Sequence, residues 1–81
     1  MDKLTELQKK MAEAQGHKVE IQMFKNLKTV YKDNICIGIC VACVSPQDND
    51  SDAASLYIQI PEYDGLIEIS EKKIENIKLL D

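Results

Sequence analysis

Apolar residues recur at spacings of three and four near the start of the chain, and this period indicates an amphipathic helix. The members of this apolar stripe are Leu4, Leu7, Met11 and Ala14. We therefore expect a helix over residues 2–15, with an ion pair between Glu6 and Lys10 on its surface. Gly16 is placed to end it, because glycine readily adopts the left-handed conformation that follows many helices.

After residue 17 the period changes to two, which is typical of half-buried β-strands. Polar and apolar residues alternate over 18–23, where Val19, Ile21 and Met23 share one face. A second strand is predicted by the uninterrupted apolar run 35–44. One face of this run carries Ile35, Ile37, Ile39 and Val41, and the other carries Cys36, Gly38, Cys40 and Ala42. Small residues around a central glycine suit a strand that bends sharply or lies close under another element.

Alternation resumes over 54–60 and stops at Pro61, which predicts a third strand, and residues 66–69 predict a fourth. Ser70 is a candidate N-cap for one helical turn, and residues 74–80 form either a fifth strand or a terminal helix. Turn-forming residues fill the connections at 26–34, 45–53 and 63–65. The pattern predicts an α+β chain, mostly β, with one domain over 1–81. In it, an N-terminal helix (1–16) precedes a small five-stranded antiparallel barrel (17–81).

The tail Ile67-Glu68-Ile69-Ser70-Glu71-Lys72-Lys73-Ile74-Glu75-Asn76-Ile77 resembles the strand, one-turn helix and strand that end SH3-like and Sm-like small barrels. The N-terminal helix and Gly38 in the second strand are also similar to the Sm-like arrangement. In RNA-binding Sm-like proteins, Asp and Asn follow that glycine, and an Arg- or Lys-Gly pair lies near the tail. Here Val44-Ser45 and Ser70-Glu71 fill those stretches. The resemblance implies a fold, and a fold does not determine a function.

The three cysteines have the spacing C-x3-C-x2-C, which holds an iron–sulfur cluster in radical-SAM enzymes. A cluster needs its sulfurs to converge on a loop, whereas this run predicts a strand. At roughly 3.3 Å per residue, Cys36 and Cys40 would lie about 13 Å apart, and Cys43 would point to the opposite face. We therefore interpret the cysteines as buried thiols and expect no cofactor.

Cysteine usage and hydropathy also bear on location. An odd number of cysteines and no signal-peptide pattern at the N-terminus argue against a secreted disulfide framework. The longest apolar run, 35–44, is well short of the roughly 20 residues that a membrane-spanning helix needs. We expect a cytoplasmic protein that does not insert into a membrane.

An acidic loop places Asp48, Asp50 and Asp52 at the first, third and fifth positions of a calcium-binding EF-hand pattern. Ala53 stands where that pattern requires glycine, and Gln59 stands where it requires a bidentate Glu. We therefore predict no metal site. The loop is either a solvated turn or a contact for a basic partner.

The charges are segregated along the chain. Residues 1–32 carry seven Lys and four acids, whereas residues 33–70 carry seven acids and no Lys; the net charge of the whole chain is −4. The predicted barrel is therefore largely acidic, which opposes binding to phosphate backbones. Arg, the residue best suited to phosphate and base recognition, is absent from the sequence.

No arrangement of residues in the sequence suggests catalysis. His17 is the only histidine and follows the predicted helix stop, where it would cap or solvate the helix end; Glu62 and Glu68 are isolated carboxylates. We expect no catalytic residues and no enzyme activity. Phe24 and Tyr57 lie on the outward phase of their predicted strands, where they form either a contact patch or part of a small core.

Two functions are compatible with these features. The first is a non-catalytic interaction module that binds a protein partner or itself through Phe24, Tyr57, Asp48, Asp50 and Asp52. Its Ile-rich, Lys-only composition suggests an accessory or inhibitor protein of a low-GC bacterium, phage or mobile element. The alternative is an Sm-like RNA-binding protein that acts as a ring oligomer. The Lys residues that would bind RNA in that case are Lys9, Lys10, Lys18, Lys25 and Lys28.

Overall fold

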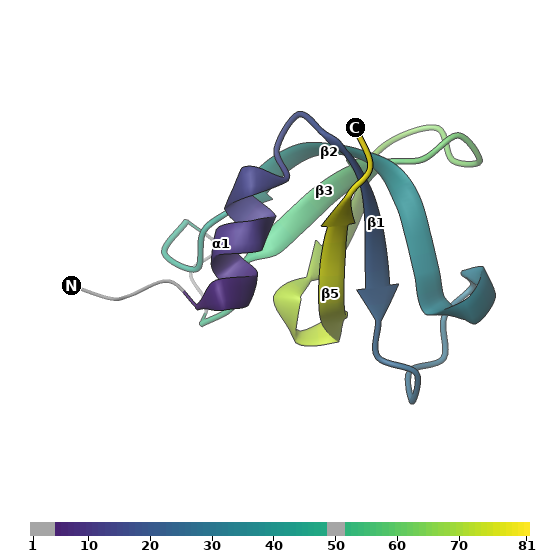
Figure 1. Ribbon diagram of the computed structural model, residues 1–81, viewed down its shortest axis with the longest axis horizontal. Helices are drawn as coiled ribbons and strands as arrows, with labels where there is room; N and C mark the ends of the chain where they lie inside the picture. Colours follow the sequence, from purple (N-terminus) through teal and green to yellow (C-terminus); the bar gives the residue numbers. More distant parts are fainter. Residues whose placement is uncertain (1–4, 49–51) are drawn as a thin grey trace.

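The computed structural model describes residues 5–48 and 52–81 of the chain. In chain order, the first elements are helix α1 (Glu6–Glu13), strand β1 (Lys18–Met23), the 3-10 turn η1 (Lys32–Asn34) and strand β2 (Ile35–Val44). They are followed by β3 (Ser55–Gln59), β4 (Ile67–Ser70), the 3-10 turn η2 (Glu71–Lys73) and β5 (Ile74–Leu79). One helix and a five-stranded antiparallel sheet confirm the predicted α+β, mostly β class (Figure 1).

Helix α1 begins later than the sequence pattern predicts. Thr5 is its N-cap: the hydroxyl of Thr5 accepts a hydrogen bond from the Gln8 N–H (3.0 Å), and the Gln8 side chain accepts one from the Thr5 N–H (3.1 Å). This reciprocal pair satisfies two amides at the helix start and gives Thr5 an extended backbone. The prediction of helix at residue 5 is therefore wrong, and residues 1–4 lie outside the described residues.

The predicted surface ion pair of α1 is also wrong. Glu6 approaches Lys9 at 3.9 Å, and the ammonium of Lys10 instead donates a hydrogen bond to the side-chain oxygen of Asn76 in β5 at 3.1 Å. Lys10 therefore links the helix to the sheet.

Gly16 ends the turn after α1, as predicted, with a φ of 84°. Its N–H donates to the Cys40 carbonyl (2.7 Å), and the Cys40 N–H donates to the His17 carbonyl (2.9 Å). The end of the helix is thus joined directly to the middle of β2.

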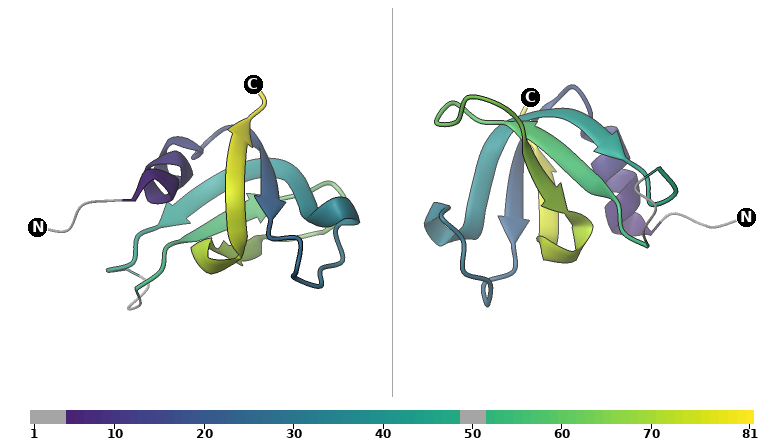
Figure 2. Two further views of the ribbon diagram at one scale, coloured as in Figure 1. Left: turned by 60° about the horizontal axis from the view of Figure 1, so that its bottom comes forward. Right: turned by 180° about the vertical axis from the view of Figure 1, so that it is seen from behind.

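The strands form one sheet in the order β4-β3-β2-β1-β5, and every neighbouring pair is antiparallel. β2 curves strongly across this sheet (Figures 1 and 2). Its first half pairs with β1 over Ile35–Ile39, and its second half pairs with β3 over Ile39–Val44. Among the described residues β4 and β5 are the outermost strands and do not pair with each other, so the sheet is not closed.

Strand positions agree closely with the alternation of the sequence. β1 and β2 have the predicted bounds, β3 lies within 54–60, and β4 is displaced by one residue from 66–69. The segment 74–80, for which strand and helix were both open, forms β5. The hydroxyl of Ser70 caps η2 by accepting a hydrogen bond from the Lys72 N–H at 3.3 Å, as predicted.

Asn34 organises the connection between β1 and β2. Its side-chain amide donates to the carbonyls of Phe24 (2.9 Å) and Leu27 (2.8 Å), and its oxygen accepts from the Thr29 hydroxyl (2.8 Å). Asp33 and Asn34 both have left-handed backbones, with φ of 56° and 57°. Asp and Asn tolerate this conformation better than other non-glycine residues, which explains the turn chemistry predicted for 32–34.

The core lies between α1 and the inner face of the curved sheet. Met11 of α1 and Ala14, the C-cap of α1, are fully buried in a single cluster with residues from all five strands. The strand residues of this cluster include Val19, Ile21, Cys36, Cys40, Leu56, Ile58, Ile69, Ile74 and Ile77. β2 therefore turns Cys36, Gly38 and Cys40 inward.

The bulge between β2 and β3 corrects one expectation for the cysteines. The register shifts between Cys40 and Ala42, so that Cys40 lies opposite Ile58 and Cys43 lies opposite Leu56. Both of these partners are fully buried, and directly opposed residues share a face of the sheet. Cys43 is therefore on the inner face with Cys40, and the prediction that it points to the opposite side is wrong because a bulge resets the alternation. For the same reason Ala42, opposite half-buried Tyr57, lies on the outer face, and the prediction that it shares a face with Cys40 is also wrong.

Candidate functional site

The outer face of β2 carries three exposed apolar side chains, Ile37, Ile39 and Val41, here called the β2 stripe. Their exposed fractions are 43%, 49% and 48%. Ile37 lies opposite Glu20 of β1, and Ile39 lies between Lys18 of β1 and Gln59 of β3. Polar residues of the neighbouring strands therefore flank Ile37 and Ile39 on the outer face of the sheet.

The close approach of β3 to Gly38 explains why the branched side chains of β2 face solvent. A Cβ atom at Gly38 would lie 2.4 Å from the Gln59 carbonyl oxygen and within 3 Å of the Ile58 and Ile60 side chains. The inner side of β2 therefore has room only for small residues, and the branched residues must face solvent.

Two adjoining hollows lie beside the first half of β2, with volumes of about 650 and 820 Å³. Both are lined by Ile37, Ile60, Glu62 and Tyr63. The first, here called the edge groove, is lined in addition by Val30, Tyr31, Lys32, Ile35, Cys36 and Ile67. Val30 and Tyr63 are exposed to 94% and 54%, so the groove has apolar side chains on both of its rims.

The carboxylate of Glu62 acts on two of the groups that line the edge groove, which Lys32 also lines. Burial raises the pKa of the Tyr31 hydroxyl, and nearby Cys36 and Glu62 raise it further. The pKa of the Cys36 thiol is likewise raised, first by burial and then by the Glu62 carboxylate. Both groups are therefore uncharged at neutral pH, and the carboxylate of Glu62 is the negative charge that acts on them.

The three thiols are all free, with Cys36 and Cys40 buried and Cys43 half-buried. Burial, together with the neighbouring Cys43, raises the pKa of Cys40 to about 11. Burial and then Glu71 raise the pKa of Cys43. No group of three potential metal ligands occurs among the described residues. The thiols contribute to packing, and they are poor nucleophiles at neutral pH because the thiolate is the reactive form.

Phe24 and Tyr57, the two aromatic residues predicted as contacts, are not brought together. Phe24 follows β1 and is 38% exposed, and its N–H donates to the Lys73 carbonyl at 3.2 Å. Tyr57 is half-buried in β3 opposite Ala42. Phe24 lies beyond the Gln22–Ile35 pair, so about seven residues of β2, or roughly 20 Å of strand, separate the two positions.

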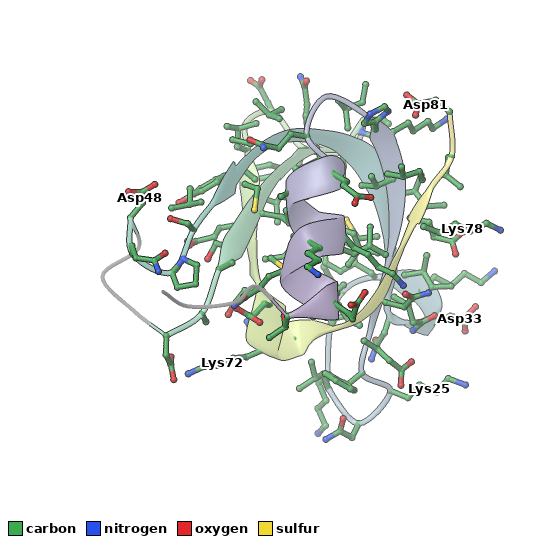
Figure 3. The ribbon with its side chains drawn as sticks, turned by 60° about the vertical axis from the view of Figure 1, so that its left-hand side comes forward. Lys25, Asp33, Asp48, Lys72, Lys78 and Asp81 are labelled. Carbon is green, nitrogen blue, oxygen red and sulfur yellow. The ribbon has the colours of Figure 1, made fainter. Side chains whose placement is uncertain are left out.

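The acidic loop is only partly described, because Asp50 lies outside the described residues. Asp48 is exposed and points outward from the ribbon (Figure 3), and its N–H donates to the Ser45 hydroxyl at 3.3 Å. Asp52 forms an ion pair with Lys72 of η2 at 3.3 Å. One of the three carboxylates predicted to meet a basic partner therefore already has a basic neighbour within the chain.

His17 forms a contact that its position in the sequence did not suggest. Its Nδ1 atom lies 2.9 Å from a carboxylate oxygen of Asp81, and the Lys18 N–H donates to the other oxygen at 3.2 Å. The hydrogen bond from Lys18 and then that from His17 lower the pKa of Asp81. These contacts hold the end of the chain beside the start of β1.

Ile37, Glu62 and Tyr63 were not predicted as functional residues. The two faces of the run 35–44 were recognised, but sequence alternation does not say which face of a wholly apolar strand is buried. Pro61 was the available signal for the groove, since a proline at the end of β3 turns the chain away from β2.

No family model, curated protein or solved structure matches the chain. In the described part of the chain, no helix is long and apolar enough to cross a membrane.

Proposed function

We propose that this chain is a non-catalytic interaction module that binds a protein partner, or a second copy of itself, through the β2 stripe. The observation that carries the proposal is the exposure of Ile37, Ile39 and Val41, each between 43% and 49%. Contiguous exposed apolar side chains in the middle of a sheet are typical of interaction surfaces.

The apolar surface extends beyond the stripe. Tyr63 and Leu66, in the connection between β3 and β4, are exposed to 54% and 50%. Tyr63 lines both hollows beside the first half of β2 together with Ile37. Aromatic residues at the centre of apolar surfaces commonly anchor protein interfaces.

The charge around this surface favours a basic partner. Residues 33–70, which include β2, β3 and β4, contain seven acids and no Lys, whereas Lys18 and Lys32, from outside this segment, line the hollows beside β2. An acidic segment of this kind attracts a basic protein and slows association of two identical copies. This supports an accessory or inhibitor role in which the chain occupies the basic surface of another protein.

An SH3-like or Sm-like barrel remains our interpretation of the fold. It is supported by three features: the strand order β4-β3-β2-β1-β5, the division of β2 between β1 and β3, and the one-turn helix between β4 and β5.

One observation favours the alternative of an Sm-like ring that binds RNA. In the described sheet, β4 and β5 each have one neighbour, so each offers an unpaired edge for a neighbouring copy. A ring predicts a large closed oligomer in light scattering and retained RNA. A monomer or dimer free of RNA would exclude it.

The proposed function is tested with the double variant Ile39→Lys and Val41→Lys, matched by Glu75→Lys, which makes the same change of net charge at an exposed position of β5. Each protein, after its fold is checked by circular dichroism, is used for affinity capture from the source cell and for light scattering. We expect wild type and Glu75→Lys to retain the same partner or the same oligomer, and the double variant to lose it. A monomeric wild type that retains no protein, or a double variant that retains the same partner equally well, would contradict the proposal.

A further inference from the structure

The first half of β2 has an unpaired edge. In Figure 1 this half runs down the right side of the molecule with β1 on one side and no strand on the other. Pairing with β3 ends at Ile39, so Ile35–Gly38 has β1 as its neighbour on one edge and the edge groove on the other.

The hydrogen-bond pattern shows which backbone groups face the groove. The Cys40 N–H donates to the His17 carbonyl, and hydrogen-bonded pairs recur at every second residue of an antiparallel ladder. Gly38 and Cys36 therefore bond to β1, and the N–H and C=O of Ile37 point away from it. The carbonyl of Ile35 points the same way, whereas its N–H donates to the Lys32 carbonyl.

Pro61 leaves these groups without a partner. Continuing the register beyond the Ile39–Gln59 pair would place Pro61 opposite Ile37. Proline has no N–H to donate, and the chain turns away from β2 at this point. Within the described residues, no backbone hydrogen bond joins Ile37 to the connection between β3 and β4.

The walls of the edge groove suit an extended chain. Ile37, Ile60 and Tyr63 provide apolar surface beside the unpaired backbone groups. Such an edge pairs readily with an added strand, in which main-chain hydrogen bonds supply affinity and alternate side chains supply specificity.

Two carboxylates beside the edge groove favour a basic side chain in the added strand. Glu62 lines both hollows and Asp64 lines the second, and neither forms an ion pair within the described chain. Lys32 lines the edge groove and Lys18 lines the second hollow, but neither ammonium forms an ion pair with these carboxylates within the described chain. A second copy of this chain would bring the same two carboxylates toward the groove, whereas a basic segment would complement them.

We propose that the edge groove binds an extended segment of another protein as an additional strand beside Ile35–Gly38, and that this segment alternates apolar and basic side chains. This inference rests on the proposed function and names its binding mode. The apolar side chains of the segment lie against Ile37 and Tyr63, and a basic side chain lies against Glu62.

The probe for this inference is a synthetic seven-residue peptide that alternates lysine and valine, with both ends blocked. Titration into the isotopically labelled full chain should produce saturable changes in the amide signals of Ile35, Ile37 and Tyr63. Two further peptides separate the contributions: one carries glutamate in place of lysine, and one is the lysine peptide with alternate backbone amides methylated. Loss of the strand hydrogen bonds should weaken binding about tenfold or more.

Two protein variants complete the test. Glu62→Lys should weaken binding of the lysine peptide and strengthen that of the glutamate peptide, whereas Glu75→Lys, an equal change of charge in β5, should alter neither. Ile37→Pro removes the N–H that faces the groove, and it should abolish binding in a chain that circular dichroism shows to be folded. Since the methylated peptide leaves the protein unchanged, the test does not depend on that variant folding.

The inference is overturned if the lysine peptide does not bind, if methylation leaves its affinity unchanged, or if the signals that move lie elsewhere. It is also overturned if the Ile37 amide is already protected by self-association, which would show a second copy in the groove. In all of these cases the proposed function still stands if the β2 stripe variants lose a cellular partner that wild type retains. The proposed function is contradicted independently if the wild-type chain is monomeric and retains no protein.

Discussion

The backbone of Gly38 in β2 lies directly against the carbonyl of Gln59 in β3. A Cβ at position 38 would meet the Gln59 oxygen at 2.4 Å and the side chains of Ile58 and Ile60 at 2.8 and 2.9 Å. This close approach decides that the small face of β2 is buried and that the β2 stripe is exposed. The surface proposed to bind a partner is therefore a consequence of one glycine.

Gly38→Ala should lower the free energy of unfolding by about 1–3 kcal/mol, because the added methyl group overlaps a backbone atom of the adjacent strand. Urea denaturation followed by circular dichroism measures this change. Gly16→Ala is a comparison of a different kind: nothing lies within 4 Å of the added methyl group there, so any loss of stability comes from the positive φ alone. Equal stability of Gly38→Ala and wild type would contradict the proposed reason for the orientation of β2.

Glu71 connects three elements through one carboxylate oxygen. This oxygen accepts hydrogen bonds from the Gln8 side chain of α1 (2.7 Å) and from the Ala54 N–H beside β3 (2.6 Å). Glu71→Ala should lower stability by about 1–3 kcal/mol because it leaves both donors without their acceptor, and Glu71→Gln, which keeps an oxygen, should lower it less. Thermal or urea unfolding compares both with Glu75→Ala, an exposed control expected to change stability by less than about 0.5 kcal/mol. A Glu71→Ala protein as stable as this control would refute the link.

Much of the fold was predictable from the sequence because alternation and turn residues are local signals. The bounds of β1 and β2, the Gly16 stop and the Ser70 cap all depend on residues close together in the chain. The capping box of Thr5 and Gln8 is also local, but the apolar stripe continues past it to Leu4, so periodicity alone predicts a helix that begins too early.

Features that depend on contacts between distant residues were not predictable. Both faces of 35–44 are apolar, so only the approach of Gln59 to Gly38 reveals which one is buried. The inward position of Cys43 depends on a bulge opposite β3, which strict alternation cannot anticipate. The edge groove is made by segments that meet only in the folded chain, and Glu62 has no local pattern that marks it.

Asn34 and Asp33 provide a paired test of the connection before β2. Both have left-handed backbones, but the hydrogen bonds to Phe24, Leu27 and Thr29 belong to Asn34. Glycine relieves the backbone strain at either position, so Asp33→Gly should be neutral or stabilising by up to about 1 kcal/mol. Asn34→Gly should instead be destabilising by about 1–3 kcal/mol because it leaves two carbonyls and a hydroxyl without this partner. Urea denaturation distinguishes them, and equal effects of the two substitutions would show that the side chain of Asn34 contributes nothing.

The raised pKa of Cys40 predicts how the free energy of unfolding changes at alkaline pH. Burial raises the pKa of Cys40 from 9.0 to about 11, so between these values the folded chain keeps a proton that the unfolded chain has lost. The unfolded state binds fewer protons in this range, and the free energy of unfolding must therefore fall as pH rises from about 9 to 11.

Urea denaturation at intervals of pH measures this dependence, in parallel with Cys40→Ala. The variant should be less stable at pH 7, since it loses buried side-chain contacts, but its stability should fall less steeply above pH 9. Alkylation gives an independent readout: at pH 7 half-buried Cys43 should react before Cys40, and all three thiols should react together once the chain is unfolded. Rapid alkylation of Cys40 in the native chain, or identical alkaline slopes for wild type and Cys40→Ala, would contradict a buried and protonated Cys40.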